Sequence, residues 1–491
     1  MKKRIFYSLS MCAMLMLSGC AQHHNDNKEV KVSLPREFNT NQLDAQGFDA
    51  PMPVYNAIYQ PLVTYGKNGK IEPGLATSWE ASEDGKHYLF HLKKNVKFND
   101  GSDFDASAVK FSIERAKATD TTDPMETLDK LKSITIKDKH TVEIELKSPS
   151  NQVLNELSQV RPLRIMSPHA VKGGNTTGKF EKAIGTGPFK VADSTNETVS
   201  FQPNTYYRNG HPLNYNLTFQ SIEDSDSRHL AIESHSIDIT GGSLGQMTPQ
   251  QVKESHRNKA LSVHTSPSTE TQFMGFNPQH KILQDKTMRE AISKAINTDD
   301  LSSDKKLKGL FQQNVQYVNA HNQPDNVYSP STSKSLIRSL GYKMNNDGYF
   351  EKDGHILSLK LALQTDEFPA WKTKAEIMQQ DLKKDRTYTN ALMPYNFLNA
   401  RFKQDGSRPG VFANDTTLTS MIRQFPTIIN MHDRQRAFNK LSSYIDQQYL
   451  IVPISYPNET FVTSPKIRQF EFSGQTDAPI NYDKLKVSNN D

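Results

Sequence analysis

The side chains that most often do chemistry in proteins are scattered along this chain and complete no catalytic motif. The sequence has 15 His, and only His23 and His24 are adjacent. It contains no Gly-rich phosphate loop ending in Lys-Ser/Thr, no GxSxG segment and no zinc-binding HExxH. Gly185-Thr186-Gly187 runs into Pro188, which stops the helix that would hold a pyrophosphate. These patterns give no positive indication of an enzyme.

The two cysteines lie together at the N-terminus. Cys12 and Cys20 stand in a segment with a basic start, an apolar run to Leu17 and a small-residue pair before Cys20. This arrangement resembles a bacterial lipobox, in which the cysteine is acylated and becomes the new N-terminus after cleavage. The alternative is an ordinary signal peptide. We expect a lipoprotein signal peptide over residues 1–19, lipidation at Cys20 and a polar tether over 20–29.

Composition indicates a folded protein of several compact units. The chain has 491 residues, of which 35% are hydrophobic and 23% charged. That length is too great for one core. The formal net charge is +5, and Lys2, Lys3 and Arg4 lie in the presumed signal segment. Acids and bases are interspersed, so no nucleic-acid surface is expected. No stretch after residue 20 has the eighteen apolar residues of a membrane helix.

Strand and helix patterns alternate along the whole chain. Alternating apolar residues predict strands over 30–36 and 86–98 and a hairpin over 132–147. Asp105 is a plausible N-cap of a helix to Ala118, and Asp224 and Asp226 are interpreted as caps of a helix over 227–235. Helices are also expected over residues 150–159 and 284–297. The fold class is therefore mixed α/β (α+β).

Six sequence blocks resemble one protein family. They are EPGLATSW (72–79), VKFNDG through FDA (96–106), GTGPF (185–189), NxYYxxGxP (204–212), REAIxxAIN (289–297) and VPISY (452–456). In this order they are similar to the solute-binding lipoproteins of peptide and nickel ABC transporters. The blocks and the sequence beside them cover the chain from about residue 30 to the C-terminus.

The resemblance implies a two-lobed clamp of the periplasmic-binding-protein type, with an extra subdomain in lobe I. Lobe I would comprise residues 30–265 and 458–491, and lobe II residues 266–457. The ligand would lie in the cleft between the lobes, which close by hinge motion. The expected partners are a membrane permease and its ATPase, and the protein would be a monomer held by lipid at the extracytoplasmic face of the cell membrane.

Residues 157–164, LSQVRPLR, are similar to the Arg-Pro-aromatic-Arg segment of nickel binders. There the first arginine grips a carboxylate of a small chelator around the metal. The planar guanidinium suits this role because it bonds a carboxylate bidentately and stays charged. The resemblance therefore implies that Arg161 binds the ligand, with Arg164 as a second candidate. The alternative is that both arginines are structural.

The sequence departs from nickel binders in the presumed lobe II. The segment 408–418, RPGVFANDTTL, looks shortened, and Asp415 falls where those proteins can have a metal-binding His. Asp415 could accept hydrogen bonds from a ligand amine, and Asn414 beside it is a further candidate for ligand binding. The interpretation we favour is that Asp415 caps the following helix. We assign no metal ligand to the protein itself.

The cargo is the open question at this point. We expect nickel carried by a small organic chelator such as histidine, because imidazole and carboxylate suit Ni(II). No resident cofactor is expected. The alternative is an oligopeptide, although no acidic residue stands out as a partner for a peptide amino terminus.

Overall fold

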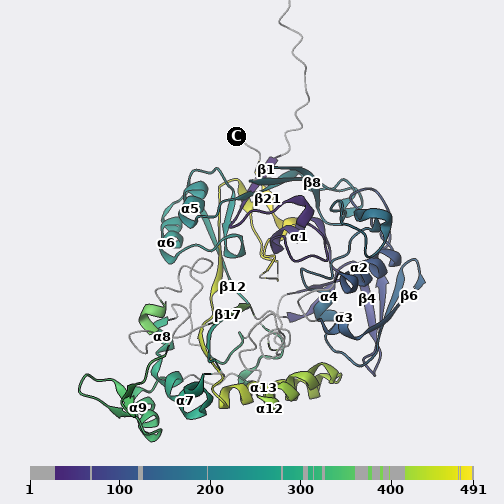
Figure 1. Cartoon of the computed structure of the whole chain (residues 1–491). Helices are drawn as coiled ribbons and strands as arrows, with labels where there is room; N and C mark the ends of the chain where they lie inside the picture. Colours follow the sequence, from purple (N-terminus) through teal and green to yellow (C-terminus); the bar gives the residue numbers. More distant parts are fainter. Residues whose placement is uncertain are drawn as a thin grey trace, which may run out of the picture.

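The computed structural model describes residues 28–66, 69–119, 125–195, 197–277, 280–301, 308–312, 315–322, 327–359, 374–378, 387–390, 398, 415–473, 475 and 477–488. These residues form two bodies, one above the other in Figure 1. The upper body, lobe I, contains a seven-stranded and a four-stranded sheet. The lower body, lobe II, contains a three-stranded sheet and the helices beneath it.

A mixed seven-stranded sheet is the frame of lobe I. β1 pairs in parallel with β10 and β11, and the other neighbouring strands are antiparallel. Val30, Val32 and Leu34 of β1 are buried, as the alternation in the sequence predicts. In order across the sheet, the strands are β12 (Ser262–Pro267), β19 (Asn458–Thr463), β11 (Ile239–Gly241), β1 (Lys28–Leu34), β10 (Tyr215–Ser221), β9 (Thr198–Pro203) and β8 (Phe189–Ser194).

A four-stranded antiparallel sheet forms the right-hand side of lobe I in Figure 1. Its strands, in order, are β4 (Ala76–Ala81), β5 (His87–Leu92), β7 (Thr141–Leu146) and β6 (Leu131–Asp138). Three helices pack beside this sheet. α2 (Ala106–Ala118) contacts β6 and β7, α3 (Glu126–Lys130) contacts α2, and α4 (Val153–Leu157) contacts α3. One continuous apolar core joins this sheet to the seven-stranded sheet.

The remaining elements of lobe I are short. They are α1 (Met52–Ile58), α5 (Ser225–Glu233), α6 (Pro249–Arg257), the ladder of β2 (Val63–Tyr65) with β3 (Ile71–Pro73), and the ladder of β20 (Ile467–Gln469) with β21 (Lys486–Val487). Single 3₁₀ turns in the two lobes are η1 (Thr40–Gln42), η3 (Pro168–Ala170), η4 (Lys172–Gly174), η5 (Tyr207–Asn209), η6 (Gly242–Leu244), η7 (Lys281–Gln284), η8 (Ala320–Asn322), η9 (Phe425–Thr427) and η10 (Tyr482–Lys484).

Lobe II is built around a three-stranded antiparallel sheet with β13 in its middle. The strand order is β17 (Thr387–Asn390), β13 (Glu270–Gly275) and β18 (Ile451–Ser455). Its helices are α7 (Lys286–Ala295), α8 (Thr298–Leu301), α9 (Pro330–Ser339), α12 (Thr416–Gln424) and α13 (Met431–Gln447). A small sheet of β14 (Lys343–Met344), β15 (Phe350–Lys352) and β16 (His355–Ile356) completes the described part. Two apolar clusters form its core.

The chain passes between the lobes at two adjacent places. β12 belongs to the seven-stranded sheet and β13 to the sheet of lobe II, so the first crossing lies at Ser268 and Thr269. β18 and β19 place the second crossing at Tyr456 and Pro457. Pro267 is opposite Asn458 on one side of the crossings, and Gln272 is opposite Ser455 on the other. The two crossing segments therefore run antiparallel, side by side.

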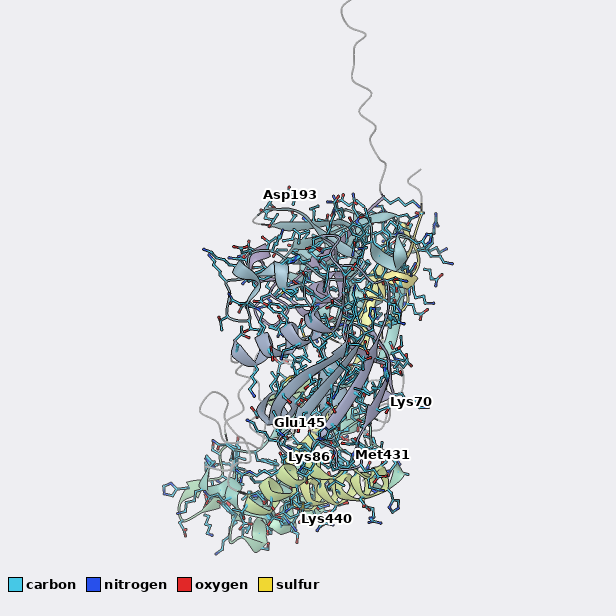
Figure 2. All side chains as sticks on the ribbon, turned by 90° about the vertical axis from the view of Figure 1, so that its right-hand side faces the viewer. Lys70, Lys86, Glu145, Asp193, Met431 and Lys440 are labelled. Carbon is cyan, nitrogen blue, oxygen red and sulfur yellow. The ribbon has the colours of Figure 1, made fainter. Side chains whose placement is uncertain are left out.

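Away from the crossings, the four-stranded sheet meets lobe II. Figure 2 shows Lys86 and Glu145 at the lower part of this sheet, above the helix that carries Met431 and Lys440. Asn151, in the turn after β7, makes three of the hydrogen bonds between them. Its backbone N–H donates to the Pro426 carbonyl at 2.8 Å, and its Nδ2 donates to the carbonyls of Phe425 and Ile428 at 2.9 and 2.8 Å.

The GTGPF block acts as a close-packed turn on α1. A Cβ atom at Gly185 would lie 2.0 Å from the carbonyl oxygen of Ile58, and one at Gly187 would lie 2.6 Å from the same carbonyl. The N–H of Gly187 donates to that oxygen at 2.8 Å. Only glycine allows this approach of two backbones, so the block positions β8 against α1.

The predicted caps Asp105 and Asp224 and the predicted hairpin are confirmed. Asp226 is not a cap, because it lies inside the first turn of α5, where its Oδ1 accepts from Nε2 of Gln251 at 2.7 Å. Asp105 and Asp224 accept from backbone N–H groups at the starts of α2 and α5, and β6 and β7 form the hairpin. The helix predicted over 150–159 is shorter, ending at Leu157. The Ser158 hydroxyl donates to the carbonyl of Asn155 at 2.7 Å, a local bond that competes with the helix. In the described part, no helix has the length and apolar character needed to cross a membrane.

Glu156 of α4 generates a prediction about stability and pH. Its carboxylate accepts from the N–H groups of Glu126 and Thr127 at 2.9 and 2.7 Å, at the start of α3. Burial raises the pKa of this fully buried carboxyl from 4.5 to about 7. The unfolded chain therefore releases this proton at lower pH than the folded protein. We expect the free energy of unfolding to fall by about 3 kcal/mol from this group as pH rises from 4.5 to about 7.

Chemical denaturation across this pH range measures the effect. Glu156→Gln should remove this part of the pH dependence, because an amide does not titrate. Glu197→Gln, at an exposed position, is the matched control and should keep the slope of the parent protein. An unchanged slope in Glu156→Gln would contradict the assignment.

Candidate ligand-binding site

Arg161 is held in one orientation by lobe I. Its Nη1 donates to the carbonyls of Phe48 and Ala50, the latter at 3.1 Å. The guanidinium carbon lies 5.0 Å from the centre of the Phe48 ring, a cation–π contact. The Tyr55 hydroxyl is a further neighbour. The residue is partly buried, and these contacts fix its guanidinium group in position.

No full counterion accompanies this charge in the described part of the chain. Burial lowers the pKa of Arg161, and attraction to Tyr55 and Asp477 opposes that effect. None of the described carboxylates lies within the 4.0 Å of an ion pair with Arg161. A fixed guanidinium of this kind can bind a carboxylate, because its planar N–H edges match the two carboxylate oxygens.

Arg164 has very different surroundings, although it is only three residues away. Its side chain is 2% exposed. Nε donates to the carbonyl of Val160 at 3.1 Å, and Nη2 donates to Oε1 of Gln475 at 3.2 Å. Burial lowers the pKa of Arg164 to about 9. The structure therefore does not bring the two predicted arginines to one face, and Arg164 ties its segment to the C-terminal part of lobe I.

Asp415 caps α12, which is the interpretation that the sequence favoured. Its Oδ1 accepts from the N–H of Leu418 at 2.9 Å. The Tyr444 hydroxyl of α13 donates to the same carboxylate at 2.9 and 3.1 Å. A ligand contact by Asp415 stays a prediction. The other predicted positions, Asn414 and the lipidation site Cys20, lie outside the described residues.

A group of acids near the crossings was not found from the sequence. Glu459, at the start of β19, is 8% exposed and accepts from the N–H of Ser243 at 3.2 Å. Burial raises the pKa of Glu459 well above its usual value, and Glu270 and Asp477 raise it further. Asp477 is thus an electrostatic neighbour of both Glu459 and Arg161. Nothing in their spacing could reveal this group, since its members come from three distant segments.

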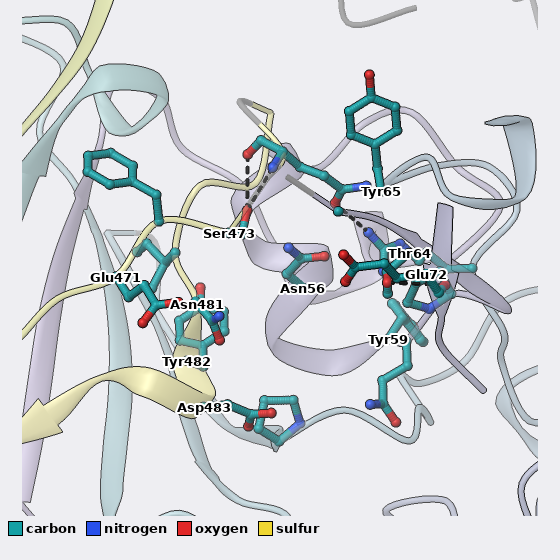
Figure 3. Close-up of a pocket in the computed structure, with 18 of the residues that line it drawn as sticks. Asn56, Tyr59, Thr64, Tyr65, Glu72, Glu471, Ser473, Asn481, Tyr482 and Asp483 are labelled. Atoms are coloured by element: carbon teal, nitrogen blue, oxygen red, sulfur yellow. Dashed lines mark hydrogen bonds between the residues drawn. The ribbon is translucent and has the colours of Figure 1, made fainter. Parts of the chain in front are cut away.

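Lobe I also contains a pocket of about 400 Å³ (Figure 3). One wall comes from α1, β2 and β3, and another from residues 471–473, 475 and 480–483 near the C-terminus. Figure 3 shows Asn56 between Glu72 on one side and Glu471 on the other. Arg164 lines this pocket, and Arg161 is not among the described lining residues.

The last question about the site is whether the protein's own side chains could hold a metal ion. Among the described residues there is no group of three or more His, Cys, Asp and Glu suited to this role.

Two curated proteins are similar to this chain over most of its length. The nickel-binding periplasmic protein of Escherichia coli (strain K12) is 29% identical over 395 residues, covering 78% of this chain and 73% of the relative. The glutathione-binding protein GsiB of Salmonella paratyphi A is 27% identical over 328 residues, covering 64% of this chain and 62% of that protein.

Among solved structures, NikA from Brucella suis in complex with Fe(III)-EDTA superimposes with a TM-score of 0.85 at 25% identity. The match covers 94% of this chain and all of that one. The model of the bacterial extracellular solute-binding proteins, family 5, matches residues 70–385, which include five of the six blocks. This chain therefore belongs to the bacterial extracellular solute-binding proteins, family 5, and has their two-lobed mixed α/β fold.

Proposed function

We propose that this protein is the extracytoplasmic solute-binding lipoprotein of an ABC importer and that it captures nickel as a small organic chelate. The observation that supports nickel as the cargo is the 29% identity, over 78% of the chain, to a nickel-binding periplasmic protein. The Brucella suis relative supports a chelate, because its metal is held by the carboxylate-rich chelator EDTA. Histidine is the chelator we favour, since imidazole and carboxylate groups suit Ni(II).

Arg161 is the residue we assign to the chelator. Phe48 and Ala50 hold its Nη1, so little side-chain entropy is lost when another edge of the guanidinium binds a carboxylate. The chelator supplies the metal ligands, and the protein recognises the chelator's charge and shape. The reaction is capture and release, with no covalent step.

Capture depends on movement of lobe II against lobe I. We propose that lobe II runs over residues 266–457 and that lobe I comprises 30–265 and 458–491, in agreement with the crossings at 268–269 and 456–457. Bending at these two segments opens and closes the cleft. Cys20 anchors the monomeric protein to the membrane through lipid, the tether 20–29 gives it reach, and the closed form delivers its cargo to the permease and ATPase.

A peptide is the second candidate cargo. The similarity to a glutathione-binding protein favours it, as does the acidic group of Glu459, Glu270 and Asp477. A peptide would place its amino terminus at these acids and its carboxylate at Arg161. Nickel remains the proposal because the nickel-binding relative matches a larger share of the chain.

Calorimetric titration of residues 21–491 tests the cargo. We expect heat from Ni(II) with L-histidine and little from Ni(II) alone. Arg161→Ala should weaken this binding by about 1.5–3 kcal/mol, the usual contribution of a hydrogen bond to a charged group. Arg161→Lys should restore part of the loss, because it keeps the charge without the planar fork.

The control is Arg436→Ala, at an exposed arginine that pairs with Asp433 on α13, and it should bind as the parent protein does. Unchanged affinity in Arg161→Ala would remove Arg161 from the site. Binding of glutathione with no response to nickel and histidine would overturn the nickel assignment in favour of a peptide.

Asn151 supplies a second test, through closure. Its side chain makes two hydrogen bonds to the carbonyls of Phe425 and Ile428 in lobe II, which favour the closed form. Asn151→Ala should therefore lower ligand affinity by about 1–3 kcal/mol without touching the ligand. Titration together with small-angle scattering of the ligand-free protein measures this shift. Unchanged affinity and compactness would mean that the four-stranded sheet and lobe II move as one body.

A further inference from the structure

The pocket within lobe I contains a buried charge with no acidic partner. Arg164 is 2% exposed and lines the pocket. Its Nε and Nη2 donate to the carbonyl of Val160 and to Gln475. Nη1 makes no hydrogen bond to any described residue, and burial is the sole cause that lowers its pKa. Burying a cation without a counterion is costly, so an anion in the pocket would relieve a cost already present.

Other polar side chains line the same space, and some of their atoms form no hydrogen bond to a described residue. The side-chain amides of Gln60 and Asn481 line the pocket and make no hydrogen bond within the described part of the chain. Asn56 donates to the carbonyl of Ala478 at 3.2 Å, which leaves its side-chain oxygen to accept. A concave site with a few unsatisfied polar groups is the usual form of a small-molecule site, and about 400 Å³ lies within the usual size.

The acidic side chains of the lining select the charge of the occupant. Glu72 is exposed and forms no ion pair with a described residue, and Glu471 lies on the other side of Asn56 (Figure 3). Asp483 also lines the pocket but already binds Arg208 and the Tyr207 hydroxyl. These carboxylates disfavour an occupant with two negative charges and favour one that pairs a single carboxylate with a cationic group.

We propose that this pocket binds a free α-amino acid, with its carboxylate at Arg164, its ammonium group toward Glu72, and the amides of Gln60 and Asn481 bonding the remainder. All described lining residues belong to lobe I, so binding does not require the lobes to close. The proposal is independent of the nickel cargo and of Arg161.

Calorimetry on residues 21–491, freed of metal with a chelating resin, tests the site. Each of the twenty amino acids is titrated separately, and the best is then compared with its analogue lacking the amine and its analogue lacking the carboxylate. We expect binding of the intact amino acid, and weaker binding of both analogues by roughly tenfold or more, since each loses one charged contact.

Variants then locate the binding. Asn481→Trp, which fills the pocket, should abolish it, whereas Asn481→Ala should weaken it only modestly. Arg164→Lys should weaken it by roughly tenfold, because lysine cannot pair bidentately. Arg161→Ala should leave it unchanged. Circular dichroism and thermal unfolding establish that each variant is folded.

Two outcomes would overturn the proposal. One is that no amino acid binds the metal-free protein. The other is that binding survives Asn481→Trp and is lost in Arg161→Ala, which would place the amino acid in the cleft. The first outcome leaves the titration of nickel with histidine unaffected, so this proposal can fail while the proposed cargo stands.

Discussion

Two adjacent strand crossings are the constraint on which the rest of the structure depends. β12 and β19 pair in lobe I, β13 and β18 pair in lobe II, and the crossings between them run side by side. On the lobe II side, the Ser455 hydroxyl donates to Gln272 at 2.6 Å, and Lys374 donates to both side chains. Both crossings are covalent, so this pair of strands joins the two lobes. The hydrogen bonds of Asn151 to Phe425 and Ile428 are a separate connection, between the four-stranded sheet and lobe II.

The C-terminal part of lobe I connects the features that concern ligands. Gln475 binds the buried Arg164, whereas Asp477 is an electrostatic neighbour of Arg161. The Ala478 carbonyl accepts a hydrogen bond from Asn56, and the buried Tyr482 hydroxyl donates to the carbonyl of Pro53 in α1. The described residues of this part of the chain therefore include an electrostatic neighbour of Arg161, Asp477, and residues that line the lobe I pocket, Gln475 and Tyr482.

Much of the fold was predictable because it rests on local patterns. The alternation over 132–147 and the caps Asp105 and Asp224 are short-range signals, and each produced the predicted element. The helix after residue 150 was predicted too long, because the Ser158 side chain competes with the backbone of its last turn. The cap at Asp415 is also a short-range signal, since this aspartate directly precedes the helix and accepts from the N–H of Leu418 in its first turn.

The sequence by itself determined the class of fold, the family resemblance and the candidate Arg161, because all three depend on contiguous segments. Only the tertiary structure decided that Arg161 and Arg164 face different surroundings, because that depends on Phe48, Ala50 and Gln475, far away in the chain. It also decided which acids lie near the crossings and which amides line a common pocket. Burial and electrostatic neighbourhood belong to pairs of residues that are distant in sequence, and no spacing along one chain encodes them.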